Sequence, residues 1–224
     1  MTDPEPDEFM SRLREADRAA LITRGRRRQW PAGASLYLEG ESCKTVMIVE
    51  SGRVKAFSLT EQGEEILLAV RGPGALLGEL SAVDGGPRST SVAALEPVAA
   101  LVVPLPSFID YLRTHGDAAI ALLQLVTAKL RDSDRKRVES AAYDIPARVA
   151  RRLVELADRF GEPDGQGVRI AVALSQDELA GWVGASREAV AKALRVLRDR
   201  GYLTTGRRTM TVLDLDALRR RAGV

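Results

Sequence analysis

The spacing of hydrophobic and polar positions changes along the chain, from a short strand-like period to a helical one. Between residues 26 and 105, short apolar and β-branched runs are separated by turns that contain glycine or proline. Strands that recur about every ten residues predict an antiparallel roll or barrel. A parallel sheet is excluded because its crossovers need about a dozen residues. The expected strands are 35–38, 46–49, 54–59, 65–70, 90–94 and 99–103.

Helical spacing of apolar residues precedes and follows this roll. It predicts a short amphipathic helix at about residues 9–22. After Pro106, a short helix over 107–113 leads to a long one from Asp117 to about Ala142. At 1.5 Å per residue, the long helix would span about 39 Å. Strands followed by helices in this order predict an α+β protein.

The residues from Asp144 onward predict a small second domain. With Asp144 as its cap and Pro146 in its first turn, a helix is expected through Phe160. A loop over 161–167 and a strand over 168–174 follow. The chain then predicts helices over 176–183 and 187–200, a hairpin around Gly206 and a basic tail.

The segment that starts at Ser175 predicts a helix-turn-helix. Ser175 and Glu178 have the spacing of a capping box, in which each side chain bonds the other's backbone N–H. The helix is expected to end at Gly184, where a left-handed conformation costs little, and Ser186 can cap the next helix. Two short helices that meet at a glycine turn are typical of a DNA-reading motif.

The second helix of this motif has an apolar face and a basic face. Arginine matches the two acceptors of guanine, and glutamate accepts from the amino group of cytosine. We therefore expect Arg187 and Glu188 to contact base edges and Lys192 to contact a base or a phosphate. Arg207 and Arg208, in the hairpin that follows, would form a wing beside the DNA backbone.

A basic helix alone would also fit the solvated face of a protein-binding domain. The capping box, the glycine turn and the wing together favour DNA binding. Gln176 and Ser186 are candidates for phosphate contacts. As residues at helix starts, however, both would be present without any DNA.

A second candidate site lies in the roll, where Gly78 and Glu79 precede Arg88 and Ser89 by about ten residues. A glycine lets backbone N–H groups approach a ligand closely, and an arginine offers a forked cation to phosphate oxygens. Ser89 adds a hydroxyl. Glu79 fits the hydroxyls of a ribose, so the set indicates a nucleotide with one compact phosphate. The alternative is a Glu79–Arg88 ion pair across a hairpin.

Composition excludes several classes of function. The net charge is +2, but basic residues are in excess only after Asp144. Cys43 is the only cysteine and His115 the only histidine, which excludes an internal disulfide and multi-histidine metal sites and leaves little for catalysis. No apolar run approaches a membrane span of roughly 18 residues, and the acidic start is not a secretory signal. We expect a cytoplasmic protein that binds no metal or membrane and is not an enzyme.

Taken together, these motifs resemble the Crp/Fnr family of bacterial transcriptional regulators, especially its actinobacterial members. Gly78-Glu79-Leu80-Ser81 with Arg88-Ser89 is similar to the phosphate-binding cassette of the cyclic AMP receptor proteins. Residues 144–149 and 183–190 are similar to their C-terminal domain, and the resemblance extends over about residues 10–218.

The resemblance implies three parts: an effector-binding β-roll over 1–116, a long dimerisation helix over 117–143 and a winged helix-turn-helix over 144–217. It implies effector contacts in the cassette, with Gly78 and Ser89 on the phosphate. The expected effector residues are Gly78, Glu79, Leu80, Ser81, Arg88, Ser89, Ser133 and Asp134. The expected DNA-binding residues are Gln176, Ser186, Arg187, Glu188, Lys192, Arg207 and Arg208.

The long helix departs from the family pattern. Cyclic AMP-binding members place two small polar residues against the adenine, and the corresponding positions are Ser133 and Asp134. Asp134 would need a donor if buried, which guanine could also supply. Leu123, Val126 and Leu130 predict a dimer seam, but residues 132–137 are all polar, which a heptad seam does not favour.

The resulting hypothesis is a homodimeric transcriptional regulator gated by a cyclic nucleotide, with cyclic AMP as the first choice. It would bind a palindromic DNA site and work with RNA polymerase. The alternative is an effector-independent Crp-like regulator whose roll serves only for dimerisation or docking.

Overall fold

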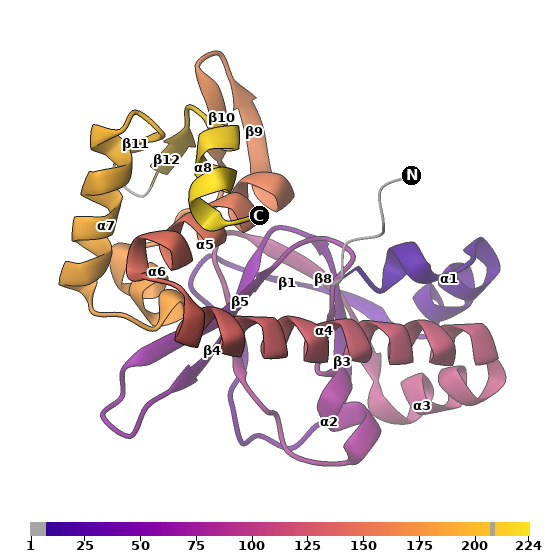
Figure 1. The fold of residues 1–224 in the computed structure, drawn as a ribbon. Helices are drawn as coiled ribbons and strands as arrows, with labels where there is room; N and C mark the ends of the chain where they lie inside the picture. Colours follow the sequence, from indigo (N-terminus) through magenta and orange to yellow (C-terminus); the bar gives the residue numbers. More distant parts are fainter. Residues whose placement is uncertain (1–7, 207–208) are drawn as a thin grey trace. The chain divides into compact units, whose positions relative to one another are not determined.

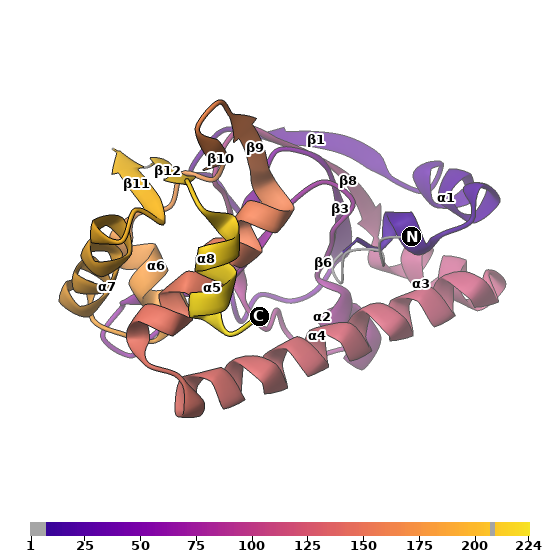
Figure 2. The ribbon, with the colours of Figure 1, turned by 45° about the horizontal axis from the view of Figure 1, so that its top comes forward.

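The computed structural model describes residues 8–206 and 209–224. Most of its elements are labelled in Figures 1 and 2. They form two compact units. The first contains the described residues up to Ser58 together with Ala69–Asp134, and the second contains Leu59–Leu68 and Arg135–Val224.

Two four-stranded sheets form the roll. The first has the order β1-β8-β3-β6, and the second has the order β2-β7-β4-β5. Neighbours such as β3 and β8 pair antiparallel, with Ile48 opposite Leu101. The predicted antiparallel roll is therefore confirmed. The strands are β1 (Arg26–Trp30), β2 (Ser35–Tyr37), β3 (Thr45–Ser51), β4 (Val54–Leu59), β5 (Glu65–Arg71), β6 (Leu76–Leu77), β7 (Ser91–Ala94) and β8 (Val98–Pro104).

The sequence does not predict the first strand. β1 reads Arg-Arg-Arg-Gln-Trp, and its first four residues are exposed on both faces. A strand at the edge of a sheet needs no buried face along its whole length and often carries charges. Alternation therefore gives no signal, and only Trp30 at its end is buried in the core.

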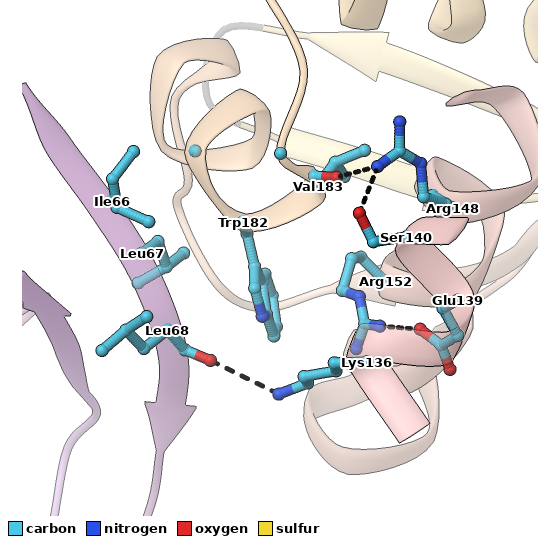
Figure 3. A pocket seen from close by; sticks show the side chains of 12 residues that line it. Ile66, Leu67, Leu68, Lys136, Glu139, Ser140, Arg148, Arg152, Trp182 and Val183 are labelled. Atoms are coloured by element: carbon cyan, nitrogen blue, oxygen red, sulfur yellow. Dashed lines mark hydrogen bonds and ion pairs between the residues drawn. The ribbon is translucent and has the colours of Figure 1, made fainter. Parts of the chain in front are cut away.

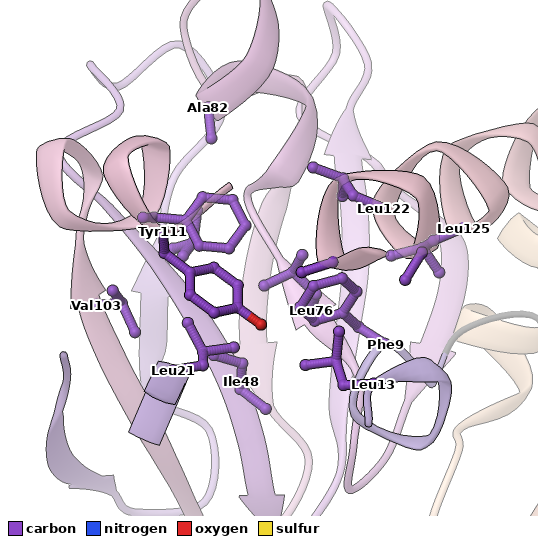
Figure 4. Packing of buried hydrophobic residues seen from close by; sticks show 14 of the residues in the cluster. Phe9, Leu13, Leu21, Ile48, Leu76, Ala82, Val103, Tyr111, Leu122 and Leu125 are labelled. Carbon is purple, nitrogen blue, oxygen red and sulfur yellow. The ribbon is translucent and has the colours of Figure 1, made fainter. Parts of the chain in front are cut away.

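Two apolar clusters hold the roll together. One contains Trp30, Val54 and Val92. The other packs residues of β3 against α1 (Glu15–Ile22), α3 (Leu105–Thr114) and α4 (Gly116–Ala142), and Figure 4 shows Tyr111 and Leu122 within it. Leu122 and Leu125 of α4 belong to this cluster, so one face of the long helix is fixed to the roll.

The C-terminal part combines helices with a four-stranded sheet of order β11-β12-β10-β9. Asp144 caps α5 by accepting from the backbone N–H of Ala147, as predicted. The elements are α5 (Ile145–Phe160), β9 (Gly161–Asp164), β10 (Gly167–Ile170), α6 (Gln176–Val183), α7 (Arg187–Asp199), β11 (Leu203–Gly206), β12 (Thr209–Val212) and α8 (Leu215–Ala222).

Two expectations for this part are wrong. The predicted loop over 161–167 contains β9 and leads into β10 as a hairpin, with Glu162 opposite Arg169. The predicted basic tail is helix α8, which Asp214 caps and which packs on α5. Its arginines conceal the apolar stripe of Ala217 and Leu218, both buried. Among the described residues, no helix has the length and hydropathy to cross a bilayer.

Candidate ligand pocket and nucleic-acid interface

The turn before α2 (Glu79–Asp84) brings a glycine into direct contact with an arginine. Gly78 is the N-cap of α2 and has a φ of 82°, in the left-handed region. A Cβ at this position would overlap Arg88 Nη1. Only glycine therefore allows both the turn and the close approach of the guanidinium. The structure brings together the two residues that the sequence singles out as a phosphate site.

Arg88 is a buried cation, with 4% of its surface exposed. Its Nη2 donates to the carbonyl oxygen of Thr45 at 2.6 Å, and its Nη1 donates to that of Gly78 at 3.5 Å. Among the described residues, no ion pair joins Arg88 to a carboxylate. A desolvated charge without a counter-charge is unfavourable, so this position favours an anionic ligand.

Tyr37 supports the same guanidinium from β2. The Cζ atom of Arg88 lies 4.2 Å from the centre of the Tyr37 ring. Burial raises the pKa of Tyr37, and the charge of Glu79 raises it further against the opposing effect of Arg88. The phenol is therefore neutral across the physiological range. The sequence offers no signal for this residue, because its partner Arg88 lies far along the chain, in the segment between α2 and β7.

Glu79 is also buried, with 5% exposed, but its partner is Lys129 of α4 rather than Arg88. The Lys129 Nζ lies 2.7 Å from Glu79 Oε1. The Glu79–Arg88 ion pair that the sequence left open as an alternative is thus replaced by a pair with the long helix. Lys129 lies 50 positions away in the chain, and sequence reasoning missed it.

The remaining cassette residues have different surroundings. Ser81 is buried, and its hydroxyl donates to the carbonyl of Pro87 at 2.8 Å, which fixes the segment before Arg88. Leu80 and Ser89 are exposed, as are Ser133 and Asp134 on α4. Within one chain, the structure therefore gathers Gly78, Glu79 and Arg88 but leaves the α4 pair at the surface.

Cys43 lies at the same place. Its Sγ is 3.6 Å from the Thr45 carbonyl oxygen and 3.9 Å from that of Gly78, the two acceptors that Arg88 also uses. The thiol is half-buried. Among the described residues, no group of three or more metal-ligating side chains forms a metal site.

In the C-terminal part, α6 and α7 form the predicted helix-turn-helix. Ser175 and Glu178 make the reciprocal bonds of a capping box, and Gly184 ends α6 with a φ of 67°. The Ser186 hydroxyl accepts from the backbone N–H of Ala189 and so caps α7. The buried stripe of α7 is Val190, Ala193, Leu194 and Leu197.

The residues predicted to meet DNA lie on the outer surface of these helices. Gln176, Arg187, Glu188 and Lys192 are all exposed. Hydrogen bonds from its own backbone N–H and from the Ser186 hydroxyl lower the pKa of Glu188, so it is an anionic acceptor at neutral pH. Arg187 lies 3.6 Å from Asp177 in an exposed ion pair that a competing phosphate or base could replace.

A groove of about 300 Å³ lies beside the start of α7, and Gln176, Arg187 and Thr205 are among its lining residues. Arg198 of α7 donates to the Thr205 hydroxyl of β11 at 2.8 Å, which connects the helix to the hairpin. The hairpin of β11 and β12 matches the predicted wing. Arg207 and Arg208, the two residues between β11 and β12 in the sequence, lie outside the described residues.

Two family models match the chain. Residues 27–115 match the cyclic nucleotide-binding domain, and residues 147–221 match the Crp-like helix-turn-helix domain. The two matches cover the two candidate sites.

Curated proteins and solved structures give the same picture. The chain is 33% identical to a CRP-like cAMP-activated global transcriptional regulator of Mycobacterium tuberculosis over 204 residues, 91% of each chain. It is 30% identical to the cyclic AMP receptor protein of Thermus thermophilus, with 84% of each covered. A crystal structure of a CRP-family regulator from Thermus thermophilus matches with a TM-score of 0.75 and 27% identity, over 88% of this chain and 97% of that one.

Proposed function

The chain belongs to the Crp/Fnr family of bacterial transcriptional regulators, and on that premise we propose that it is a homodimeric DNA-binding protein gated by a cyclic nucleotide. Residues 1–116 would bind the effector, 117–143 would join two copies, and 144–217 would bind a palindromic DNA site. Cyclic AMP is the first candidate effector. The protein would act in the cytoplasm, together with RNA polymerase.

The buried guanidinium of Arg88 carries the effector half of this proposal. It has two carbonyl acceptors, an aromatic platform and, among the described residues, no carboxylate in an ion pair with it. We assign the cyclic phosphate to Arg88, the Gly78 turn and the Ser89 hydroxyl, with the ribose on Glu79. Leu80 and Ser81 shape the turn, and Ser133 and Asp134 face the purine.

The long helix supplies the argument for self-association. Ile120, Leu123 and Leu130 are separated by three and seven residues, which places them on one face of the helix, and they are 55%, 61% and 62% exposed. A second copy of this helix would bury that row. Val126, expected in the seam, instead packs on the core of its own roll. Asp134 lies one turn beyond Leu130, so the purine position would adjoin the partner.

DNA binding follows from the exposed start of α7. Arg187 and Glu188 would read base edges, Lys192 would reach a base or phosphate, and Gln176 and Ser186 would contact phosphates. In a dimer, two such helices must meet half-sites about 34 Å apart. An effector that binds one arrangement of these helices more tightly shifts the population toward it.

The test has two steps. A DNA sequence is first selected from a random pool with the purified protein and 0.2 mM cyclic AMP, cyclic GMP or neither. Affinity for the selected site is then measured by fluorescence anisotropy with and without each nucleotide. We expect at least tenfold tighter binding with one nucleotide. Equal affinity in all three conditions would refute gating, and failure to select any sequence would refute DNA reading.

The effector-independent alternative has its own supporting observation, the Lys129–Glu79 ion pair. An ammonium group on the ribose carboxylate competes with ribose hydroxyls for the same oxygen. If the chain never binds a nucleotide, this pair is simply permanent. Calorimetry of the wild type with cyclic AMP and cyclic GMP separates the two proposals: heat with either favours gating, and no heat alongside tight, specific DNA binding favours the alternative.

A further inference from the structure

A cavity of about 180 Å³ lies within the second unit, which contains Leu59–Leu68 as well as Arg135–Val224. It is separate from both sites described above. Residues 66–68 of β5 form one wall, and α4, α5 and the end of α6 form the others. The walls are in close contact, because a Cβ at Gly181 would come within 2.9 Å of the Glu65 carbonyl oxygen. Figure 3 shows the Trp182 side chain between β5 and the side chains of Lys136 and Arg152.

The lining of this cavity is cationic. Lys136, Arg148 and Arg152 contribute three positive charges, and Glu139 contributes the one negative charge. Glu139 is buried and forms ion pairs with Arg152 and with Arg151, the latter at 3.0 Å. Its charge is therefore already shared. Arg152 also forms an ion pair with Glu155, which is not a lining residue. The three cations of the lining still outnumber these two carboxylates, and this excess favours an anion.

Two buried donors of the lining have no acceptor. Trp182 is 8% exposed, and its indole Nε1 has no hydrogen-bond partner in the described residues; the same is true of Arg148 Nε. Arg148 Nη1 does donate to the Val183 carbonyl at 3.0 Å and to the Ser140 hydroxyl at 3.3 Å. Unpaired buried donors are unfavourable and rare, so each points to an acceptor that completes the site.

We propose that this cavity binds a small oxyanion, a carboxylate or a phosphate, between Arg148, Lys136 and the indole of Trp182. Its volume lies below the roughly 300–1,000 Å³ of pockets for drug-sized ligands, so the occupant is smaller than a nucleotide. The apolar wall of Ile66 and Leu67 favours a carboxylate with a short apolar body over bare phosphate.

An anion at this position would act on the helix-turn-helix. Arg148 donates to the carbonyl oxygen of Val183, the last residue of α6, and α7 begins four residues later, at Arg187. A ligand that draws the guanidinium toward itself changes that hydrogen bond. The site would therefore adjust the turn that positions the DNA-reading helix.

Fluorescence of Trp182 tests the proposal. The chain has two tryptophans, so Trp30→Phe leaves Trp182 as the only one. This variant is titrated with sodium benzoate and, separately, with inorganic phosphate, at constant ionic strength held with NaCl. We expect a saturable change in emission with an apparent Kd of about 10 mM or lower, and tighter binding of benzoate. Saturation by phosphate alone would assign the site to free phosphate.

Variants in the same background identify the cavity. Arg148→Gln and Lys136→Gln should each weaken binding at least fivefold with unchanged far-UV circular dichroism. Arg169→Gln removes an exposed arginine of the same unit outside the cavity and should leave the Kd unchanged. Linear quenching without saturation, or equal effects of all three variants, would overturn the proposal. The titration contains no DNA and no nucleotide. If it fails, the anion site is refuted, whereas the proposed DNA-binding regulator is unaffected.

Discussion

At the scale of single residues, the proposed effector site depends on one buried charge and the glycine beside it. Arg88 and Glu79 could be identified from the sequence because a cation, a carboxylate and a glycine at this spacing have a chemical reason to occur together. Lys129 and Tyr37 could not be identified, because nothing in a helix or a strand indicates which distant residue it will touch. Those contacts exist only once the roll has closed.

Arg88→Gln should separate ligand binding from stability. Loss of the charge-assisted bonds to phosphate should weaken cyclic nucleotide binding about 10- to 100-fold. The unliganded protein should keep or raise its Tm, because an uncompensated buried charge is removed. Calorimetry and thermal unfolding measure the two effects. A large fall in Tm without ligand would mean that Arg88 is chiefly a structural residue.

Gly78→Ala should be more damaging than Gly40→Ala, although both positions have a φ near +80°. Each alanine carries the strain of a left-handed residue, about 1 kcal/mol. Only at Gly78 would the new Cβ also overlap Arg88, since nothing lies within 4 Å of a Cβ at Gly40. Urea unfolding should show the larger loss for Gly78→Ala. Equal losses would contradict the close packing at Arg88.

At the scale of elements, caps and turns could be predicted. An edge strand, and a helix whose few apolar residues lie among arginines, could not. Asp144, Ser175 and Ser186 cap the helices that their positions suggest, because capping is a local interaction. β1 and α8 were missed because arginines hide their structural pattern. In both cases, tertiary packing of a few apolar residues determines the element.

The cap of α5 should make stability depend on pH. The hydrogen bond from Arg221 and that from the Ala147 backbone lower the pKa of Asp144 below its ordinary value of 3.8. Its contribution is therefore present above about pH 4 and is lost as pH falls through the lowered pKa. Wild type and Asp144→Asn should converge in unfolding free energy between pH 5 and acid pH. In an Arg221→Gln background the convergence should begin at higher pH.

The recognition helix and the wing should respond differently to the loss of an arginine. Arg187→Ala should reduce discrimination against one wrong base pair by about 1–3 kcal/mol. Arg208→Ala should weaken all DNA alike and reduce the salt dependence by about one counterion. Competition binding with single-base variants of the selected site measures both. The same loss on every sequence from both variants would contradict these roles.

At the scale of the whole molecule, the order of roll, long helix and helix-turn-helix could be predicted, since a strand-like hydrophobic period gives way to a helical one and capping residues separate the helices. The partner of the long helix could not be deduced with the same precision. Val126 lies at an apolar position of α4 but faces its own roll, while Ile120 and Leu123 remain exposed. The period identifies apolar positions without indicating which chain covers them.

Leu130→Arg should therefore break the dimer. A charge in the exposed α4 row should shift sedimentation toward the monomer and weaken binding to a palindromic site at least tenfold, while half-site binding is retained. Leu59→Arg is the matched control, because Leu59 is equally exposed and lies outside α4. A monomeric Leu59→Arg, or a dimeric Leu130→Arg, would place the interface elsewhere.

The neighbour of Lys129 along the chain is Leu130, so the side chain that holds Glu79 and the one offered to a second copy share adjacent positions of one helix. A small molecule that binds the Glu79 carboxylate must displace the Lys129 ammonium group, which lies next to the proposed contact surface between two copies. If this molecule changes the affinity of one copy for another, dimerisation must change the affinity for the molecule by the same factor. Titrations at low and high protein concentration should consequently give different apparent affinities for the same small molecule.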